Sequence, residues 1–296
     1  ASKKKENNYY IFVLVNLETN KVVGASMIHG QHGNESEPHF FLKVGREHKF
    51  SETINTGFIH GTLKLGLTAQ GWTEIGGLIL SPEYRGHVQK LGKQLSYLRF
   101  LYIALKPEEF TDRIHAELMP PFDSDGNSPL WEAIGRRFMN LDYNEADRLS
   151  RENKEFILSL YPSDTIYETL LPLEARNAIG KVGETTKPVR KMLEKIGFDY
   201  VGEVDPFDGG PHFRATKEKI LPIKEAFELK VKLVEKLDQD EESRMGIIQL
   251  PSADSGFKAL SLPIIKNDDM ILIEKTVAKT FSLEEGEGLF GIYTDY

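Results

Sequence analysis

The chain has 296 residues, of which 40% are hydrophobic and 28% charged, and its formal net charge at pH 7 is -8. This is the composition of a globular protein with substantial cores. The absence of cysteine excludes disulfides and a cysteine nucleophile and fits a reducing compartment. The acidic balance argues against nucleic-acid binding, and neither a signal peptide nor a membrane helix is indicated. We therefore expect a cytoplasmic protein.

The first part of the chain predicts alternating strands and helices. Residues 9–16 and 21–28 are rich in β-branched and aromatic residues around a short turn, which predicts a hairpin. After a long polar stretch, residues 76–80 indicate a buried strand, and apolar residues recur at helical spacing over 88–105. Residues 113–120, RIHAELMP, then alternate like a strand. Helices that follow neighbouring strands begin where α/β sheets usually bind ligands.

The middle of the chain predicts further helices and a weak internal repeat. Ser128 and Pro129 have the residue types of an N-cap and of a first helical position. SPLWEAIGRRFMNLDY is similar to KPVRKMLEKIGFDYVGEV, and each predicts a helix that leads into a strand, while residues 144–162 between them look helical. Three aromatic residues at helical spacing are expected in the core: Trp131, Phe138 and Phe198.

The C-terminal quarter differs in composition from the rest. Residues 220–244 are rich in lysine and acidic residues and end in a charge run, which predicts a linker helix and a solvated linker. Short apolar runs then predict a small β-rich unit with one short helix in TVAKTFSLEEGEG. We expect three parts: a first α/β half over 1–140, a second over 141–219, and the linker helix with the β-rich unit over 220–296.

Several separated motifs carry a resemblance to a known enzyme family. In chain order they are SPLWEAIGRRFMNLDYNEADRLS, FILSLYPSDTIYETLLP, AIGKVGETTKPVRKMLEKIGFDYVGEVDPFDGGP and GFKALSLP. The sequence resembles the arginine N-succinyltransferases of the GNAT acyltransferase superfamily, as a diverged member. The resemblance implies a mixed sheet flanked by helices in two GNAT-like halves, and transfer of a succinyl group from succinyl-CoA, or of another acyl group from its acyl-CoA, to the amine of arginine or a relative. It also suggests a homo- or hetero-oligomer.

The resemblance places an acyl-CoA site at the end of the strand in GLILSP. Leu78 and Leu80 are the candidates for contacts from this strand. Arg85, Gly92 and Lys93 follow near the start of the predicted helix, where main-chain N–H groups and the helix dipole favour a pyrophosphate. This chain has two extra residues before Gly92, and an ordinary turn with exposed cations is the alternative.

Four further side chains are candidates around the amine. Glu117 is a base or an anchor for the cationic group, or a strand carboxylate in a salt bridge. Asp205 and Asp208, in the glycine turn DPFDGGPH, suit the bidentate recognition of a guanidinium, or serve the turn itself. The family's proton-donor histidine is replaced here by Gly183, and His212 is the candidate replacement.

A metal is not expected, and a non-enzymatic function stays open. The spacing of His29, His32 and His39 fits no ligand geometry, and no cysteine joins them. Two alternatives to the succinyltransferase remain: a catalytically diverged GNAT-fold binding or partner subunit, or an acyltransferase with another donor and acceptor.

Overall fold

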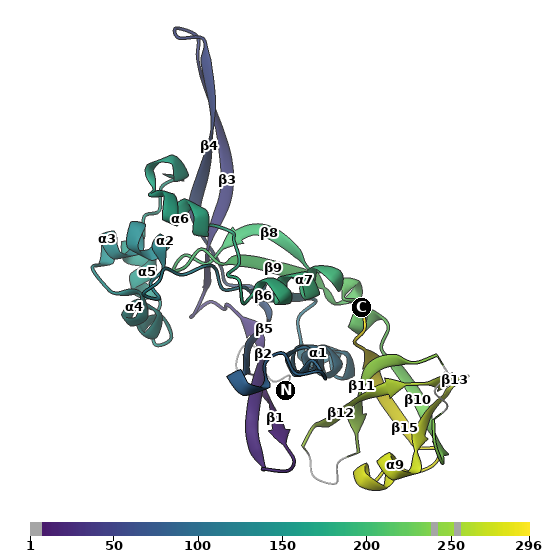
Figure 1. Cartoon of the computed structure of the whole chain (residues 1–296). Helices are drawn as coiled ribbons and strands as arrows, with labels where there is room; N and C mark the ends of the chain where they lie inside the picture. Colours follow the sequence, from purple (N-terminus) through teal and green to yellow (C-terminus); the bar gives the residue numbers. More distant parts are fainter. Residues whose placement is uncertain (1–7, 238–241, 252–255) are drawn as a thin grey trace. The chain divides into compact units, whose positions relative to one another are not determined.

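The computed structural model describes three stretches of the chain: residues 8–237, 242–251 and 256–296. These residues form two compact units (Figure 1), each assembled from separate segments. The first unit contains residues 31–74 and 113–215, and the second contains residues 8–30, 75–112 and 216–296. The predicted three-part division at 140 and 219 follows chain order and stays a prediction.

The first unit is built on a mixed sheet. Its strands are neighbours in this order: β6 (Arg113–Glu117), β9 (Pro211–Thr216), β8 (Asp199–Val204), β3 (His39–Ser51), β4 (Thr56–Thr68) and β7 (Ile166–Tyr167). The first residues of β5 (Trp72–Leu80) pair in parallel with β6, at Thr73 with Ile114 and at Glu74 with His115. Because β6 and β9 are adjacent, side chains from distant parts of the sequence share this region of the sheet.

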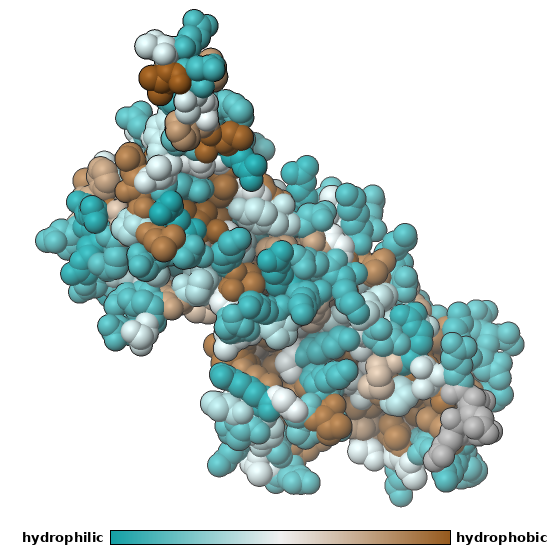
Figure 2. Space-filling model, turned by 45° about the horizontal axis from the view of Figure 1, so that its top comes forward, coloured by the Kyte–Doolittle hydropathy of each residue, from teal (hydrophilic) through white to brown (hydrophobic). Residues whose placement is uncertain are grey.

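β3 and β4 form a long antiparallel hairpin that extends beyond the rest of its unit as a two-stranded arm (Figure 1). It occupies most of the polar stretch of the sequence. Phe40 and Leu63 are buried near its base, whereas Phe50 and Phe58 near its tip are exposed. Figure 2 shows apolar residues on the surface of the arm. The pattern of the tip residues does not indicate a strand, since neither face of the tip is buried.

In the part of the first unit that the structure describes, the α-helices are α2 (Pro129–Ala133), α3 (Gly135–Met139), α4 (Tyr143–Ser150), α5 (Glu155–Leu160), α6 (Leu173–Ala178) and α7 (Lys187–Lys195). The predicted N-cap is confirmed, because the Ser128 hydroxyl accepts a hydrogen bond from Trp131 N at 3.1 Å. The same hydroxyl donates to Phe207 O at 2.8 Å, and the Trp131 and Phe207 rings stack at 4.8 Å. The Ser128 side chain thus connects the start of α2 to the turn between β8 and β9.

Two predictions for this region are corrected. Trp131 and Phe198 are buried as predicted, but Phe138 is 56% exposed, because α3 turns Gly135 and Met139 toward the core and Phe138 away from it. The first copy of the internal repeat does not lead into a strand. Asn140, with φ 52°, ends α3, and the chain enters α4 instead.

The second unit combines a hairpin, one long helix and a separate sheet. The predicted hairpin is confirmed as β1 (Tyr9–Asn16) paired with β2 (Lys21–His32), and β2 is a neighbour of β5. The predicted helix is α1 (Leu91–Leu105), whose Leu95, Phe100 and Leu101 are buried. Among the described residues of this unit, the strands of the second sheet lie in this order: β12 (Lys258–Ile264), β11 (Arg244–Leu250), β15 (Gly288–Tyr293), β10 (Phe227–Val234), β14 (Met270–Glu274) and β13 (Lys266–Asn267).

The predicted linker helix after residue 220 is wrong. α8 (Leu221–Lys224) is only four residues long, and β10 follows it and pairs with β14 and β15. Leu229 and Val231 are buried while the lysines beside them point outward, which is the period of a strand. Most of the predicted charge run, residues 238–241, lies outside the described residues.

The remaining short elements are α9 (Lys275–Phe281), as predicted, and the 3-10 helices η2 (Pro82–Tyr84), η3 (Pro107–Glu109), η4 (Glu168–Leu170) and η5 (Lys217–Lys219). None of the helices in the described part of the chain has the length and apolarity that a bilayer crossing requires.

Candidate functional site

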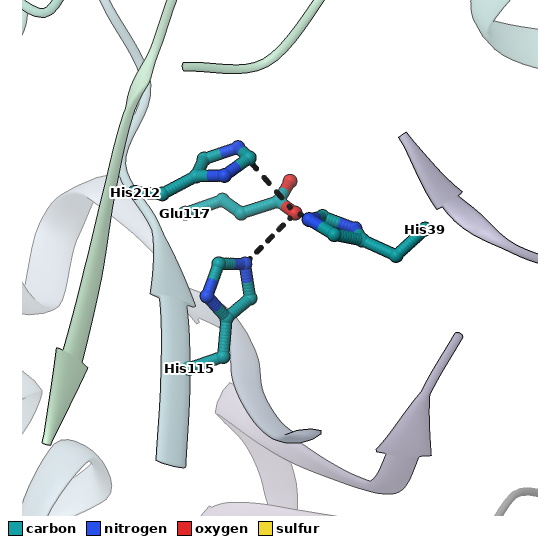
Figure 3. A group of neighbouring side chains, drawn as sticks. All are labelled: His39, His115, Glu117 and His212. Atoms are coloured by element: carbon teal, nitrogen blue, oxygen red, sulfur yellow. Dashed lines mark hydrogen bonds and ion pairs between the residues drawn. The ribbon is translucent and has the colours of Figure 1, made fainter. Parts of the chain in front are cut away.

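Four side chains of the first unit meet beside its sheet (Figure 3): His39 from the start of β3, His115 and Glu117 from β6, and His212 from β9. One ligand atom of each lies within 4.8 Å of the others. Along β6 the side chains alternate between the two faces, so His115 and Glu117, two residues apart, point the same way. We refer to these four residues as the histidine cluster.

The three histidines of the cluster face one carboxylate oxygen. Glu117 Oε1 lies 3.1 Å from His115 Nε2, 3.6 Å from His39 Nδ1 and 3.8 Å from His212 Nε2. Arg214 Nε donates a hydrogen bond to His115 Nδ1 at 3.2 Å. Because that guanidinium can only donate, His115 carries its proton on Nε2 and donates it to Glu117.

Aromatic and charged side chains pack against the histidine cluster. The Arg214 guanidinium lies 3.4 Å from the centre of the Trp72 ring and forms an ion pair with Glu203. Beside it, His32 Nδ1 lies 2.6 Å from Glu74 Oε2, and the ion pair raises the pKa of His32 against the effect of burial. Trp72 and Glu203 hold the Arg214 guanidinium in place, and its hydrogen bond to Nδ1 fixes the orientation of the His115 ring.

Burial sets the charge states of the cluster. It lowers the pKa of His212 to about 3 and that of His39 well below its ordinary value, so both imidazoles are neutral at pH 7. Burial also acts to raise the pKa of Glu117, but the imidazoles around its carboxylate outweigh this and hold it well below the usual range. At pH 7 the cluster therefore holds one ionised carboxylate beside the neutral rings of His39 and His212.

Several buried nitrogens of the cluster are unsatisfied. His39 and His212 are almost completely buried, at 2% and 0% exposure. Within the described part of the chain, His39 Nε2 and both ring nitrogens of His212 make no hydrogen bond. Buried polar atoms without partners are uncommon and call for an explanation, such as an ion or a ligand.

Asp205 and Asp208 lie in the turn between β8 and β9. Asp205 Oδ1 accepts hydrogen bonds from the main-chain N of Phe207 and of Asp208 at 2.7 and 3.0 Å, and Asp208 Oδ1 accepts one from Gly210 N at 2.7 Å. Burial, with a contribution from Glu117, raises the pKa of Asp205 to about 7, and burial and Asp205 raise that of Asp208 well above normal. One oxygen of each carboxylate therefore serves the turn, and within the described residues Oδ2 of each accepts no hydrogen bond.

Gly183 stands where the resemblance places a histidine. Its main-chain N donates to Met119 O at 2.9 Å, and a Cβ added to it would lie 2.9 Å from Pro120 O. A side chain at this position would require the backbone to move. Any side chain at position 183, histidine included, would therefore strain this backbone contact.

The five candidates for the acyl-CoA site all lie in the second unit. Leu78 and Leu80 are half-buried at the end of β5, and Arg85 is exposed, with its Nε 3.1 Å from Leu80 O. Gly92 lies in the first turn of α1 rather than in the preceding loop, and an added Cβ there would come no closer than 3.9 Å to another atom. Lys93 Nζ lies 5.2 Å from the Tyr97 ring centre. The candidates for the acyl-CoA site thus belong to the second unit. The candidates around the amine belong to the first unit: Glu117, Asp205, Asp208 and His212.

His39 and His115 were not predicted as site residues. The pattern His115-x-Glu117 in a predicted strand was the available signal for His115, since alternation places both on one face. For His39 the sequence offered only its grouping with His29 and His32, whose spacing fits no ligand geometry. Nothing local joins it to His212, because 173 positions of sequence numbering separate them (212 − 39) and only the sheet brings them together.

Mixed sheets flanked by helices place the chain in the GNAT-like α/β class. Residues 1–222 match the family model described as "Arginine N-succinyltransferase beta subunit". The chain is 32% identical over 285 residues to arginine N-succinyltransferase of Yersinia pseudotuberculosis, a match over 95% of this chain and 80% of the relative. The chain belongs to the arginine N-succinyltransferase family.

Two further comparisons agree. Arginine N-succinyltransferase of Yersinia enterocolitica is 38% identical over 232 residues, which are 78% of this chain and 66% of that protein. The structure of arginine/ornithine succinyltransferase subunit AI from Pseudomonas aeruginosa superposes with a TM-score of 0.81 at 25% identity, covering 100% of this chain and 84% of that one. The chain thus spans about two thirds to four fifths of the length of these curated relatives.

Proposed function

We propose that the protein transfers a succinyl group from succinyl-CoA to the α-amino group of arginine or a related amine. Its membership of the family over almost the whole chain carries this proposal. In the reaction the amine nitrogen attacks the thioester carbon, the C–S bond breaks as the C–N bond forms, the nitrogen loses a proton and the leaving thiolate gains one. Cytoplasmic location, favoured by the lack of cysteine, belongs to the same proposal.

The acyl-CoA is proposed to bind at the end of β5 and the start of α1. Leu78 and Leu80 would contact the pantetheine or acyl chain through main-chain and apolar atoms. Arg85 and Lys93 supply cations for the phosphates, and Gly92 leaves space beside the first turn of α1, where the helix dipole favours an anion. The absence of a close neighbour around the Gly92 Cβ position supports this assignment.

The guanidinium of the substrate is proposed to bind Asp205 and Asp208. Two carboxylates in one tight turn, each with an oxygen that accepts no hydrogen bond within the described residues, match the paired donors of a guanidinium. Their raised pKa values support the same assignment, because a bound cation would relieve the mutual repulsion of these buried acids.

Glu117 and His212 are proposed to act on the amine and the leaving group. The depressed pKa of Glu117 favours the role of an anchor for the cationic substrate over that of a base, since it stays ionised. His212 is proposed as the proton donor in place of the family histidine. Because its imidazole is neutral at pH 7, it would donate a ring N–H and not the proton of an imidazolium.

A second candidate function is a binding or partner subunit of a succinyltransferase. The packing of Pro120 O against Gly183 favours it, because no histidine fits there without movement of the backbone. The family model is named for a beta subunit and the structural relative for subunit AI. A homo- or hetero-oligomer is therefore part of this proposal.

A mass-spectrometric assay separates the two functions. The purified chain is incubated with arginine and succinyl-CoA, then with ornithine, and then with acetyl-CoA as another donor, and the N-acylated product and free CoA are measured. A succinylated amine formed in proportion to protein supports the enzyme. Binding of succinyl-CoA in titration calorimetry without product supports the binding subunit, and the absence of both contradicts each proposal.

A further inference from the structure

The histidine cluster offers more donor atoms than the hydrogen bonds of the protein use. Of its three imidazoles, only His115 makes a hydrogen bond to Glu117. His212 Nε2 points toward the same oxygen at 3.8 Å, is buried and has no hydrogen-bond partner within the described residues. A neutral imidazole has one nitrogen with a lone pair, and because neither nitrogen of His212 has a hydrogen-bond partner within the described residues, the tautomer with the lone pair on Nε2 is open to a metal ion.

The spacing of the donors matches the size of a transition-metal ion. Zinc lies about 2.0 to 2.2 Å from imidazole nitrogens and carboxylate oxygens, so its tetrahedral ligand atoms are about 3.3 to 3.5 Å apart. Glu117 Oε1 is 3.6 Å from His39 Nδ1 and 3.8 Å from His212 Nε2. These two distances exceed the ideal spacing by a few tenths of an ångström, and the ligand atoms of His39 and His212 lie within 4.8 Å of each other, so side-chain movements alone can bring the three atoms around one ion.

His115 has a different part in this arrangement. Its Nδ1 accepts from Arg214 and its Nε2 carries the proton that it donates to Glu117 at 3.1 Å. A protonated nitrogen cannot bind a metal, but hydrogen bonds that orient a ligating carboxylate are a regular feature of metal sites. His115 thus fits the role of a positioning residue behind Glu117.

We propose that His39, His212 and Glu117 bind one divalent transition-metal ion of the zinc class, with His115 positioning the carboxylate. Two imidazoles and one carboxylate suit such ions and not Mg²⁺ or Ca²⁺, which prefer oxygen ligands. The Glu117 side chain keeps 28% of its surface exposed, so the ion can enter and a further ligand can reach it. The site shares Glu117 and His212 with the succinyltransferase mechanism proposed above, and the tests below therefore read metal binding alone.

The first test uses the unaltered full chain. Protein is stripped with a chelator, dialysed and titrated with ZnCl₂ in a calorimeter, and zinc is counted by plasma mass spectrometry after gel filtration. One zinc per chain is expected, together with a rise in the melting temperature, because the metal binds the folded state. MgCl₂ should produce neither. Failure of zinc to bind at this stoichiometry overturns the proposal without any variant.

The second test identifies the ligands. His39→Gln and His212→Gln should each weaken zinc binding by at least about 100-fold, which exceeds the typical loss from an outer-shell change. His48→Gln is the matched control, because His48 is an exposed histidine of the same strand as His39. Retained binding in both ligand variants, or equal loss in the control, contradicts the site. Melting curves without zinc show whether each variant is folded.

The third test separates positioning from ligation at His115. His115→Gln keeps an N–H that can reach Glu117 and should retain zinc affinity within about tenfold, whereas His115→Ala should lose about 10- to 100-fold. Loss of binding in both variants to the extent of the His212 variant would make His115 a ligand and overturn its positioning role. Since every readout is metal binding, a failed succinyltransferase assay leaves the test unaffected.

Discussion

The histidine cluster of the first unit and the β5–α1 segment of the second are opposite kinds of candidate site. His39, His115 and His212 are buried and held by three strands of one sheet, β3, β6 and β9, with one carboxylate among them. Arg85 is exposed, and Lys90, with φ 51° and ψ 49°, precedes α1 in a left-handed conformation without a side-chain cap. Buried titratable groups influence the stability of the fold strongly, whereas exposed cations leave it nearly unchanged and act on ligands. Substitutions in the two regions should therefore differ in what they change.

The largest expected effect is on coenzyme A binding by the β5–α1 segment. Replacing both Arg85 and Lys93 with Ala should weaken the binding of CoA by about 100-fold, since charge-assisted hydrogen bonds contribute about 1.5 to 3 kcal/mol each and the exposure of Arg85 reduces its share. Titration calorimetry at two salt concentrations measures it. The double variant Lys258→Ala/Lys266→Ala, with the same charge change on exposed strand positions, is the control. Equal affinity of both variants would make the segment an ordinary turn.

The histidine cluster should respond in stability. Glu117→Ala leaves the His115 N–H without an acceptor and should lower the free energy of unfolding by about 1 to 3 kcal/mol. Arg85→Ala, at an exposed position, should change it by less than about 0.5 kcal/mol. Urea denaturation of both variants in the absence of metal provides the comparison. A Glu117 variant as stable as the Arg85 variant would show that the cluster adds nothing to stability.

Asp205 should give the first unit a pH dependence of opposite sign to that of an ordinary salt-bridged acid. Its folded-state pKa is raised to about 7, above the unfolded value of about 3.9, so folding takes up a proton and stability falls as the pH rises between these values. Asp205→Asn should reduce this slope, with the remainder coming from the buried Asp208, and should be more stable than the natural chain at pH 8 by about 1 to 2 kcal/mol.

Asp123 is the control for this pH profile. It is exposed, and main-chain N–H groups, first that of Asn127, lower its pKa. Its contribution to stability is therefore present above the unfolded pKa and is lost as the pH falls. Asp123→Asn should slightly destabilise the protein at neutral pH, and thermal melts from pH 4 to 8 distinguish the two variants. Parallel profiles would show that Asp205 is not perturbed.

The smallest effect concerns the backbone before α1. Lys90→Gly should stabilise the protein by up to about 1 kcal/mol, because glycine adopts the left-handed conformation without steric strain, partly offset by its greater freedom when unfolded. Asn140→Gly, at a left-handed position of the first unit, should gain less, since asparagine tolerates this conformation. Equal gains in thermal melts would contradict this ranking.

Local sequence patterns predicted the elements whose burial follows a regular period. The hairpin of β1 and β2, the helix α1 and the cap at Ser128 are of this kind, because alternation, helical spacing and a capping hydroxyl are local properties. The prediction failed for β10, where lysines between the buried residues of a strand gave the composition of a linker. It also assigned no element to the β3–β4 arm, whose tip has no buried face.

The sequence by itself determined the α/β class, the family and the acidic turn of Asp205 and Asp208, because these depend on residues that are close together along the chain. Only the tertiary structure decided which histidines meet. His39, His115 and His212 stand on three strands, and strand order is set by burial and main-chain pairing over the whole unit. The charge states of the cluster were likewise decided by the fold, since burial and the neighbouring Arg214 determine which nitrogens carry protons.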